Sequence, residues 1–236
     1  MGYRRINVNT VYQKVQALAN KEQRGYITPK NFNLFANQAQ QEIFDNYFHD
    51  LRTAQLKAKN NKQYSDEIET LESRISMHLS TTSLVKEDGN FHPLPGGLYH
   101  VSSLTLYNVD LGLLTYVERV DDSELREILI NPLTAPTVKR PVYVERNGYV
   151  RVYPATNQVV DITYTTKPEN ANWAYVVVSG TPMYNSNESI DFDIHISEEN
   201  NLVMRILQLA GIATNDVELL SVTAQDAANT ENKKNN

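Results

Sequence analysis

Two acidic residues and a histidine near the C-terminal end of the sequence could bind a divalent metal ion. Asp191, Asp193 and His195 alternate along the chain, so their side chains would share one face of a strand. Carboxylate and imidazole groups are ligands of divalent ions, and Glu198 and Glu199 follow closely. The alternative is a solvent-facing strand edge, where charges protect against aggregation. We favour the edge, because the intervening residues are apolar and would face the core, and we therefore predict no metal site.

Other catalytic signals are missing from the sequence. Residues 95–97 (Pro-Gly-Gly) lack the downstream lysine and hydroxyl residue of a phosphate-binding loop, and neither H-E-x-x-H nor G-x-S-x-G occurs. Four further histidines have no acidic partner placed by spacing: His49, His78, His92 and His100. We therefore predict that the protein is not an enzyme, that it has no catalytic or cofactor-binding residues, and that it uses no cofactor.

Aromatic residues suggest a binding surface instead. The chain has 14 tyrosines, which could form a sugar-binding platform or a protein interface in its central part. Four of them fall in expected strands, where ordinary cross-strand packing is the simpler explanation: Tyr143, Tyr149, Tyr153 and Tyr164. The single tryptophan, Trp173, lies close to Pro168 in an expected loop or sheet edge, which suggests a contact site.

Composition excludes several classes of protein. The chain has 236 residues, a formal net charge of −6 and no cysteine, so it has no disulfides, no cysteine-bound zinc and no thiol nucleophile. The acidic balance argues against tight non-specific DNA binding. There is no secretory signal and no apolar run near the roughly 20 residues of a membrane helix, so we expect a soluble protein made in a cytoplasm. We attribute the abundant asparagine to an AT-rich genome.

The first third of the sequence has helical periodicity. Asn9 or Thr10 can cap a first helix that ends near Gln23. Thr28-Pro29 is a strong start for a second helix, which continues to residues 60–61 and would be about 45 Å long. A third helix, starting near residue 65, would form a helical hairpin with the second.

The middle of the sequence favours antiparallel strands, with a short helix over residues 121–130. The expected strands are residues 99–107, 113–117, 141–145, 149–153 and 159–165. Asn147-Gly148 is typical of a tight hairpin turn. Four valines flanking this turn are expected to form one core face: Val142, Val144, Val150 and Val152.

The C-terminal part returns to helix. A helix begins at residues 197–199 and ends at Gly211, another short one follows Asn215, and the polar residues beyond 225 predict disorder. We therefore predict an α+β fold, in which the N- and C-terminal helices form a bundle with an inserted antiparallel β domain. The expected parts are a helical region (1–80), the β insertion (81–196), a C-terminal helix packed on the N-terminal helices (197–222) and a disordered tail (223–236).

Several runs of sequence resemble a virion structural protein of crAss-like phages. They cover most of the chain in patches: residues 11–15 (VYQKV), 20–29 (NKEQRGYITP), 32–40 (FNLFANQAQ), 133–137 (LTAPT), 139–143 (KRPVY), 167–168 (KP) with Trp173, 191–195 (DFDIH), 197–199 (SEE) and 209–212 (LAGI). The resemblance implies a component of the head–tail region, similar to the ring or adaptor proteins that dock beneath the portal. Such adaptors combine a helical bundle with a β insertion, and portal-associated rings are commonly dodecameric.

From this resemblance we expect a head-to-tail connector ring, bound to the portal and neighbouring tail proteins, through which DNA passes without specific binding. The long second helix could pack between subunits, the acidic charge could repel DNA in the channel, and the polar tail could become ordered on a neighbouring protein. The expected location is the head–tail region of the virion, after assembly in the host cytoplasm. The alternative is a tail-associated, β-rich module that binds host glycan or other tail proteins.

Overall fold

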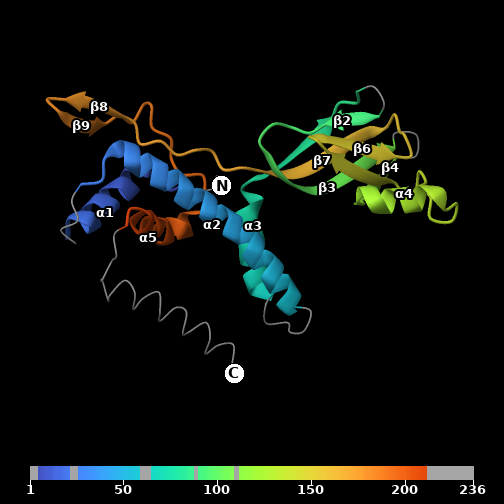
Figure 1. Cartoon of the computed structure of the whole chain (residues 1–236), viewed down its shortest axis with the longest axis horizontal. Coiled ribbons are helices and arrows are strands. Elements are labelled where there is room, and N and C mark those ends of the chain that lie inside the picture. Colours follow the sequence, from blue (N-terminus) through green and yellow to red (C-terminus); the bar gives the residue numbers. More distant parts are fainter. Residues whose placement is uncertain (1–4, 22–25, 59–64, 88–89, 109–111, 212–236) are drawn as a thin grey trace. The chain divides into compact units, whose positions relative to one another are not determined.

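The chain divides into two compact units in a computed structural model that describes residues 5–21, 26–58, 65–87, 90–108 and 112–211 (Figure 1). Unit 1 combines the two ends of the chain, residues 1–49 and 169–236, and unit 2 is residues 50–168. The predicted tail (223–236) and the helix expected after Asn215 lie outside the described residues. No helix in the described part is both long enough and apolar enough to cross a membrane.

The helices of unit 1 start where capping side chains allow. Helix α1 (Val8–Lys21) begins slightly earlier than predicted, because the Asn7 side chain accepts a hydrogen bond from the Thr10 amide at 3.0 Å. Helix α2 (Pro29–Ala58) has the predicted Thr28 cap, whose hydroxyl accepts from the Asn31 amide at 3.3 Å. The 30 residues of α2 make it about 45 Å long, as predicted.

The C-terminal helix is α5 (Glu199–Leu209), which follows a single turn, η2 (Ile196–Glu198). Helix α5 packs against α1 and buries one apolar side, formed by Leu202, Val203, Ile206 and Leu207. It ends just before Gly211, which has a φ of 72°, so the predicted stop at this glycine is confirmed.

An extended segment, residues 169–196, completes unit 1. It covers the helices with five buried side chains, those of Ala171, Trp173, Ala174, Phe192 and Ile194. The segment also contains a hairpin that the sequence analysis missed, formed by β8 (Tyr175–Val178) and β9 (Thr181–Tyr184). Its turn residues, Ser179 and Gly180, have φ values of 51° and 81°, as in the tight turns that suit the twist of two strands.

Unit 2 is built on a seven-stranded sheet with the order β1-β7-β3-β4-β5-β6-β2. Helix α3 (Ser65–Ser76) precedes the sheet, and α4 (Asp122–Ile130) connects β4 to β5. The strands are β1 (Leu79–Leu84), β2 (Phe91–Pro93), β3 (Leu98–Asn108), β4 (Leu113–Arg119), β5 (Val142–Arg146), β6 (Tyr149–Tyr153) and β7 (Val159–Thr166). All neighbouring strands are antiparallel except β4 and β5, which are parallel.

The two faces of the sheet have separate cores. The larger core lies inside the curled sheet and includes Leu104, Ile162 and Val152, from three different strands. The smaller core lies under α4, where Leu125 packs with Val120 and with the valines of β5. Because α4 is the crossover between two parallel strands, it must lie on one face of the sheet and needs an apolar surface there.

The four valines of the Asn147-Gly148 hairpin do not form one core face, so that prediction is wrong. The register pairs Tyr143 with Val152, so Val150 and Val152 face the inside of the curled sheet. Val142 and Val144 face α4 instead. Side chains alternate between the two faces along each strand, and directly paired residues of neighbouring strands share a face. The register that the turn sets therefore decides which face of the sheet each valine occupies.

The predicted fold class, a helical bundle of terminal helices with an inserted antiparallel β domain, is also wrong. The described part of the chain is a mixed α/β protein dominated by the curled seven-stranded sheet, with five α-helices. In unit 1 the apolar sides of the helices are covered partly by the extended segment 169–196 and not by helices alone. In unit 2 the α4 crossover makes the sheet mixed.

Candidate functional site

The three candidate metal ligands of the sequence do not converge. The Asp191 carboxylate accepts a hydrogen bond from the Val8 amide at 2.9 Å and from the Asn7 side chain at 3.2 Å, next to the start of α1. The His195 ring bonds to the hydroxyl and the amide of Ser197, at 2.8 and 3.2 Å. In the part of the chain that the structure describes, no three His, Asp or Glu side chains are grouped to hold a metal ion.

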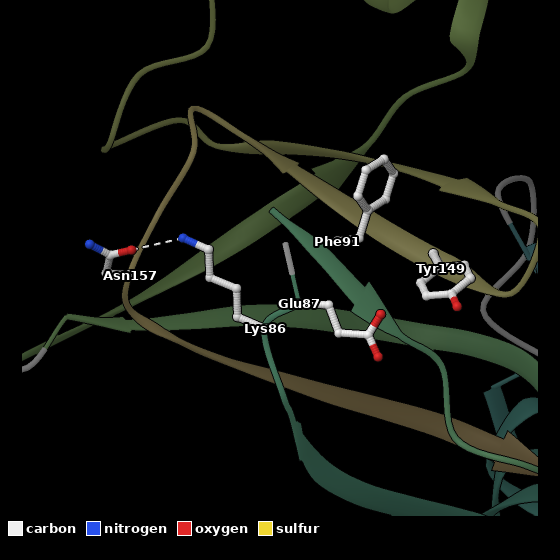
Figure 2. A pocket seen from close by; sticks show the side chains of 5 residues that line it. All are labelled: Lys86, Glu87, Phe91, Tyr149 and Asn157. Carbon is white, nitrogen blue, oxygen red and sulfur yellow. Dashed lines mark hydrogen bonds between the residues drawn. The ribbon is translucent and has the colours of Figure 1, made fainter. Parts of the chain in front are cut away.

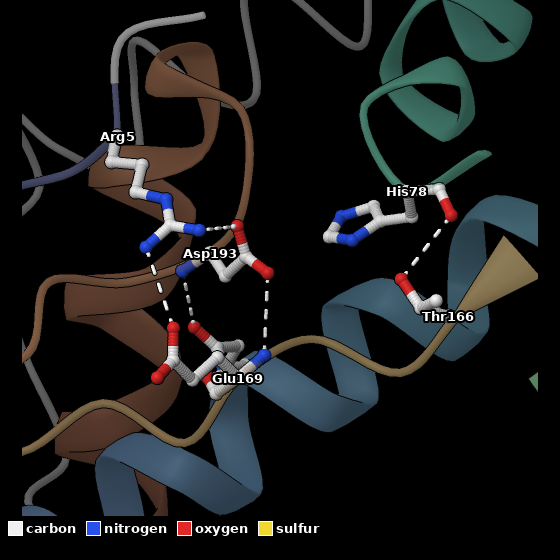
Figure 3. A network of polar contacts seen from close by, with 6 residues as sticks. Arg5, His78, Thr166, Glu169 and Asp193 are labelled. Carbon is white, nitrogen blue, oxygen red and sulfur yellow. Dashed lines mark hydrogen bonds and ion pairs between the residues drawn. The ribbon is translucent and has the colours of Figure 1, made fainter. Parts of the chain in front are cut away.

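Asp193 belongs to an ion-pair network with Arg5 and Glu169 (Figure 3). The Arg5 guanidinium lies 3.2 Å from the Asp193 carboxylate and 3.5 Å from that of Glu169, and Asp193 also accepts from the Glu169 amide at 3.3 Å. These contacts join the N-terminal residues to both ends of the extended segment. Figure 3 also shows a contact inside unit 2, where the Thr166 hydroxyl donates to the His78 carbonyl at 3.2 Å.

The two glutamates near His195 also have structural partners. Glu199 pairs with Lys14 of α1 at 2.7 Å, and the buried Glu198 accepts from the Asn201 side chain at 3.0 Å. The polar residues predicted as a charged strand edge therefore fasten the extended segment to α1 and α5. Their chemistry is that of hydrogen bonding within unit 1.

Three amide side chains of α2 hold the backbone of the extended segment. Gln40, which is 1% exposed, donates to the Glu169 carbonyl at 2.8 Å and accepts from the Asp193 amide at 2.9 Å. Asn37 donates to the Ala171 carbonyl at 2.9 Å. Residues 33, 37 and 40 lie on one side of a helix, so we name Asn33, Asn37 and Gln40 the amide row. An AT-rich genome does not explain this arrangement of amides.

Trp173 is the centre of this contact, and it is buried. Asn33 of the amide row accepts from the Trp173 amide at 2.9 Å and donates to its carbonyl at 3.2 Å, while the indole nitrogen donates to the Asn9 side chain at 3.0 Å. The indole stacks on the ring of Tyr12 with 4.0 Å between ring centroids. Because only 3% of Trp173 is exposed, it cannot present a ring face to a partner, so the suggested contact site at this residue is wrong.

Most of the other residues named from the sequence are also structural. Tyr143 is buried in the large core, and burial raises the pKa of its hydroxyl. His92 is buried in β2, and desolvation lowers the pKa of its imidazole. Of the four tyrosines expected in strands, Tyr149 is the most exposed, at 39%. Tyr149 and Tyr153 line a cleft of unit 2.

Unit 2 has a cleft of about 320 Å³ beside α4, which we call the arginine cleft. Its charged lining consists of three arginines and one carboxylate: Arg126, Arg146, Arg151 and Asp122. Arg146 pairs with Asp122 at 2.6 Å, so the guanidinium groups of Arg126 and Arg151 supply the excess positive charge of the cleft. The cleft is therefore locally cationic on a chain whose formal net charge is −6.

Aromatic rings hold Arg151 in place within this cleft. Its guanidinium carbon lies 5.1 Å from the centre of the Phe91 ring and 5.2 Å from that of Tyr153. Such cation–π contacts restrict a long side chain without neutralising its charge. The cleft can thus offer an oriented guanidinium fork, the group that best matches a planar carboxylate or phosphate.

Phe91 and Tyr149 line both the arginine cleft and a wider groove of about 870 Å³. Figure 2 shows this wider groove. The rings of Phe91 and Tyr149 meet edge to face with 6.1 Å between centroids. In the groove, Lys86 donates to the Asn157 side chain and to the Thr156 carbonyl, both at 2.8 Å. Because Lys86 already has two acceptors, the arginine cleft is the stronger candidate for binding an anionic group.

Sequence reasoning missed the arginine cleft, although part of the signal was present. Tyr149, Arg151 and Tyr153 alternate along β6, so they share one face of that strand. Phe91 comes from β2 and Arg126 from α4, and only the strand order and the α4 crossover bring them to the same place. No local pattern in the sequence indicates that meeting.

A second surface candidate is the β8–β9 hairpin of unit 1. All four residues of β8 are exposed and apolar in character, with Val177 the most exposed at 65%. Met183 of β9 is 54% exposed. Successive residues of a strand point to opposite faces, so apolar side chains are exposed on both faces of this hairpin.

Comparisons with known proteins add no family to these observations. The sequence matches no protein-family model, and a search of curated proteins finds no match.

Proposed function

We propose that this protein is a structural virion component of a tailed bacteriophage, a subunit of a head-to-tail connector ring beneath the portal. The observation that carries the proposal is the exposed apolar β8–β9 hairpin, taken together with the sequence resemblance to a virion protein of crAss-like phages. The subunit contacts further copies of itself, the portal and neighbouring tail proteins, and DNA passes through the ring without specific binding. The ring has twelve copies, and no enzymatic activity or cofactor is involved.

The hairpin supports this role because it exposes apolar side chains to solvent. A two-stranded hairpin alone is marginally stable, and contiguous apolar patches on soluble proteins usually mark an interaction surface. Exposed valines on β8, and the outer edges of both strands, which pair with no other described strand, would be covered if a second copy packed on them. Each copy in a ring both offers and receives such a surface, which is the arrangement that a closed heterologous interface requires.

The polar framework of unit 1 supports a rigid presentation of this hairpin. Trp173, which is fixed by Asn33 and Asn9, lies two residues before β8, and its ring lies 5.8 Å from that of Tyr175 and 5.7 Å from that of Tyr184. These aromatic contacts fasten the base of the hairpin to the helices. A projection that is held at its base loses little conformational freedom when it binds.

The decisive experiment compares two valine-to-lysine variants of the full chain. Val177→Lys places a charge on the hairpin, whereas Val138→Lys makes the same change at a 57% exposed position of unit 2. Light scattering after size exclusion, and negative-stain images, should show rings for the wild type and for Val138→Lys, and mainly smaller species for Val177→Lys. A wild-type chain that stays monomeric and is absent from purified virions would refute the proposal.

A tail-associated module that binds host glycan is the second candidate. The observation in its favour is the outer face of β3 and β4, where Tyr107 is 42% exposed and Tyr116 64% exposed, beside Leu114. Exposed tyrosines on a rigid sheet suit sugar recognition. Binding on a glycan array that is lost in Tyr116→Ala and kept in Trp173→Phe would favour this function, whereas the ring proposal requires no such binding.

A further inference from the structure

The ten-residue hairpin (175–184) covers only part of the surface that a ring interface needs, so other contacts must contribute. A stable interface buries roughly 800 Å² on each partner. Unit 2 offers two surfaces of opposite charge that have no function in its own fold. One is the arginine cleft, and the other is the exposed side of α3.

The exposed side of α3 is strongly acidic. Asp66, Glu69 and Glu72 recur every third residue, and Glu67 adds a fourth carboxylate in the first turn. All four are exposed, while Leu71 and Ile75 on the other side of the helix are buried. Among the described residues these four carboxylates form no ion pair, and their exposed row is about two turns long.

A single molecule cannot join these two surfaces. Figure 1 shows α3 and α4 at opposite ends of unit 2, with the seven-stranded sheet between them. In a head-to-tail arrangement of two copies, however, the α3 end of one copy can meet the α4 end of the next. Complementary charges at opposite ends of a subunit are suited to a heterologous interface, which repeats until the ring closes.

We propose that the arginine cleft of each subunit binds the acidic side of α3 of a neighbouring copy, and that this pairing sets the head-to-tail order of the ring. The proposal rests on the proposed ring function. Arg151, oriented by Phe91 and Tyr153, and Arg126 receive the carboxylates of Glu69 and Glu72. Guanidinium–carboxylate pairs are directional and can be bidentate, so they fix the register of the subunits.

Charge reversal tests this pairing in the full chain. One variant, Arg126→Glu/Arg151→Glu, has an acidic cleft and an acidic α3. The other, Glu69→Lys/Glu72→Lys, has a basic α3 and a basic cleft. Each variant alone places like charges in contact at every junction, and the concentration needed for assembly should rise about tenfold or more.

An equal mixture of the two variants should restore assembly, because every junction then pairs opposite charges. The restored ring must alternate the two chains, which only an even number of subunits permits without a mismatch. Native mass spectrometry of the mixture should therefore show both chains in equal numbers. Raising the salt concentration from 0.1 M to 1 M should weaken the wild-type ring, because it shortens the screening length from about 10 Å to about 3 Å.

The control is Lys30→Glu/Lys139→Glu, which changes the net charge by the same amount as the cleft variant at two exposed lysines outside the cleft. It should assemble like the wild type. Circular dichroism must show unchanged secondary structure for every variant, since all the substituted positions are exposed.

The outcomes separate this inference from the ring function. A wild-type ring that persists in both reversal variants, or a mixture that fails to recover, overturns the α3–cleft pairing and leaves the ring function standing. A wild type that forms no ring overturns both. Assembly that is unchanged in Arg126→Glu/Arg151→Glu, together with loss of salt-sensitive binding to a labelled DNA duplex, would assign the cleft to nucleic acid and also overturn the pairing.

Discussion

Gln40 provides the sharpest test of how unit 1 is held together. Its side chain is 1% exposed and joins two backbone groups that lie far apart in the sequence, the Glu169 carbonyl and the Asp193 amide. Gln40→Ala removes both hydrogen bonds at once. The perturbation is therefore the loss of one donor and one acceptor from a buried position.

The expected cost follows from these two groups. Leaving a buried polar group unsatisfied costs about 1–3 kcal/mol, so the loss of two such bonds in Gln40→Ala should reduce the free energy of unfolding of unit 1 by roughly 2–6 kcal/mol. Domains of this kind are stable by only about 5–15 kcal/mol, so the loss is a large fraction of the total. The thermal midpoint should fall by roughly 10–20 °C.

Trp173 makes the measurement specific to unit 1. It is the single tryptophan of the chain, it is buried, and it belongs to the segment that Gln40 holds. Urea unfolding followed by tryptophan fluorescence therefore reports on this unit alone. Gln40→Met is a second variant that keeps most of the side-chain volume, and it should lose nearly as much stability as Gln40→Ala if hydrogen bonding dominates.

Gln38→Ala is the matched control on the same helix. Gln38 is exposed and donates to the Glu42 side chain at 3.1 Å, an i to i+4 contact worth about 0.2–0.5 kcal/mol. Its replacement should change stability by no more than about 0.5 kcal/mol. If Gln40→Ala and Gln38→Ala had equal effects, the argument that the amide row holds the extended segment would be refuted.

Three further outcomes are expected. Burial lowers the pKa of His92, so below about pH 6.5 the unfolded chain binds a proton that the folded chain does not. The urea midpoint of unit 2, followed by circular dichroism, should therefore fall between pH 7.5 and pH 5.5, and it should fall less in His92→Gln. An equal fall in the wild type and in His92→Gln would contradict this prediction. Gly148→Ala should cost about 1–2 kcal/mol in thermal unfolding because Gly148 has a φ of 80° with open space around it, whereas Asn147→Gly should have little effect. Burial alone would raise the pKa of the Glu42 carboxyl, but the contact with Arg205 holds this pKa below its usual value. Arg205→Met should therefore raise the pKa of Glu42 in an NMR titration. An unchanged pKa would refute the contact between the two side chains.

Local signals in the sequence predicted most of the regular elements. Thr28-Pro29 and Asn147-Gly148 define backbone conformations by themselves, so the start of α2 and the β5–β6 turn could be read directly. The β8–β9 hairpin was missed although its run of valines and its Ser179-Gly180 turn are equally local signals. Strand β1 was missed because Ser and Thr fill its centre and make it resemble a polar loop.

The candidate sites were less predictable because they depend on contacts between distant segments. Nothing near Trp173 in the sequence indicates that Asn9 and Asn33 will bind it, at separations of 164 and 140 residues. The alternation of Asp191, Asp193 and His195 predicted a solvent-facing strand edge, but these side chains are half-buried and each bonds to a different part of unit 1. The faces of the hairpin valines required the register of β5 and β6, which composition does not encode.

The discontinuous make-up of unit 1 has a consequence for synthesis on the ribosome. Helix α1 and the first part of α2 emerge early, but the segment that covers them begins at Glu169. Translation of the intervening residues 50–168 takes about 6–24 s at the usual rates of roughly 5–20 residues per second, and unit 2 is complete by then. During that interval the apolar side chains of Val15 and Phe32 lack the segment that will cover them. Nascent chains should therefore aggregate or bind chaperones most readily before Trp173 has been synthesised.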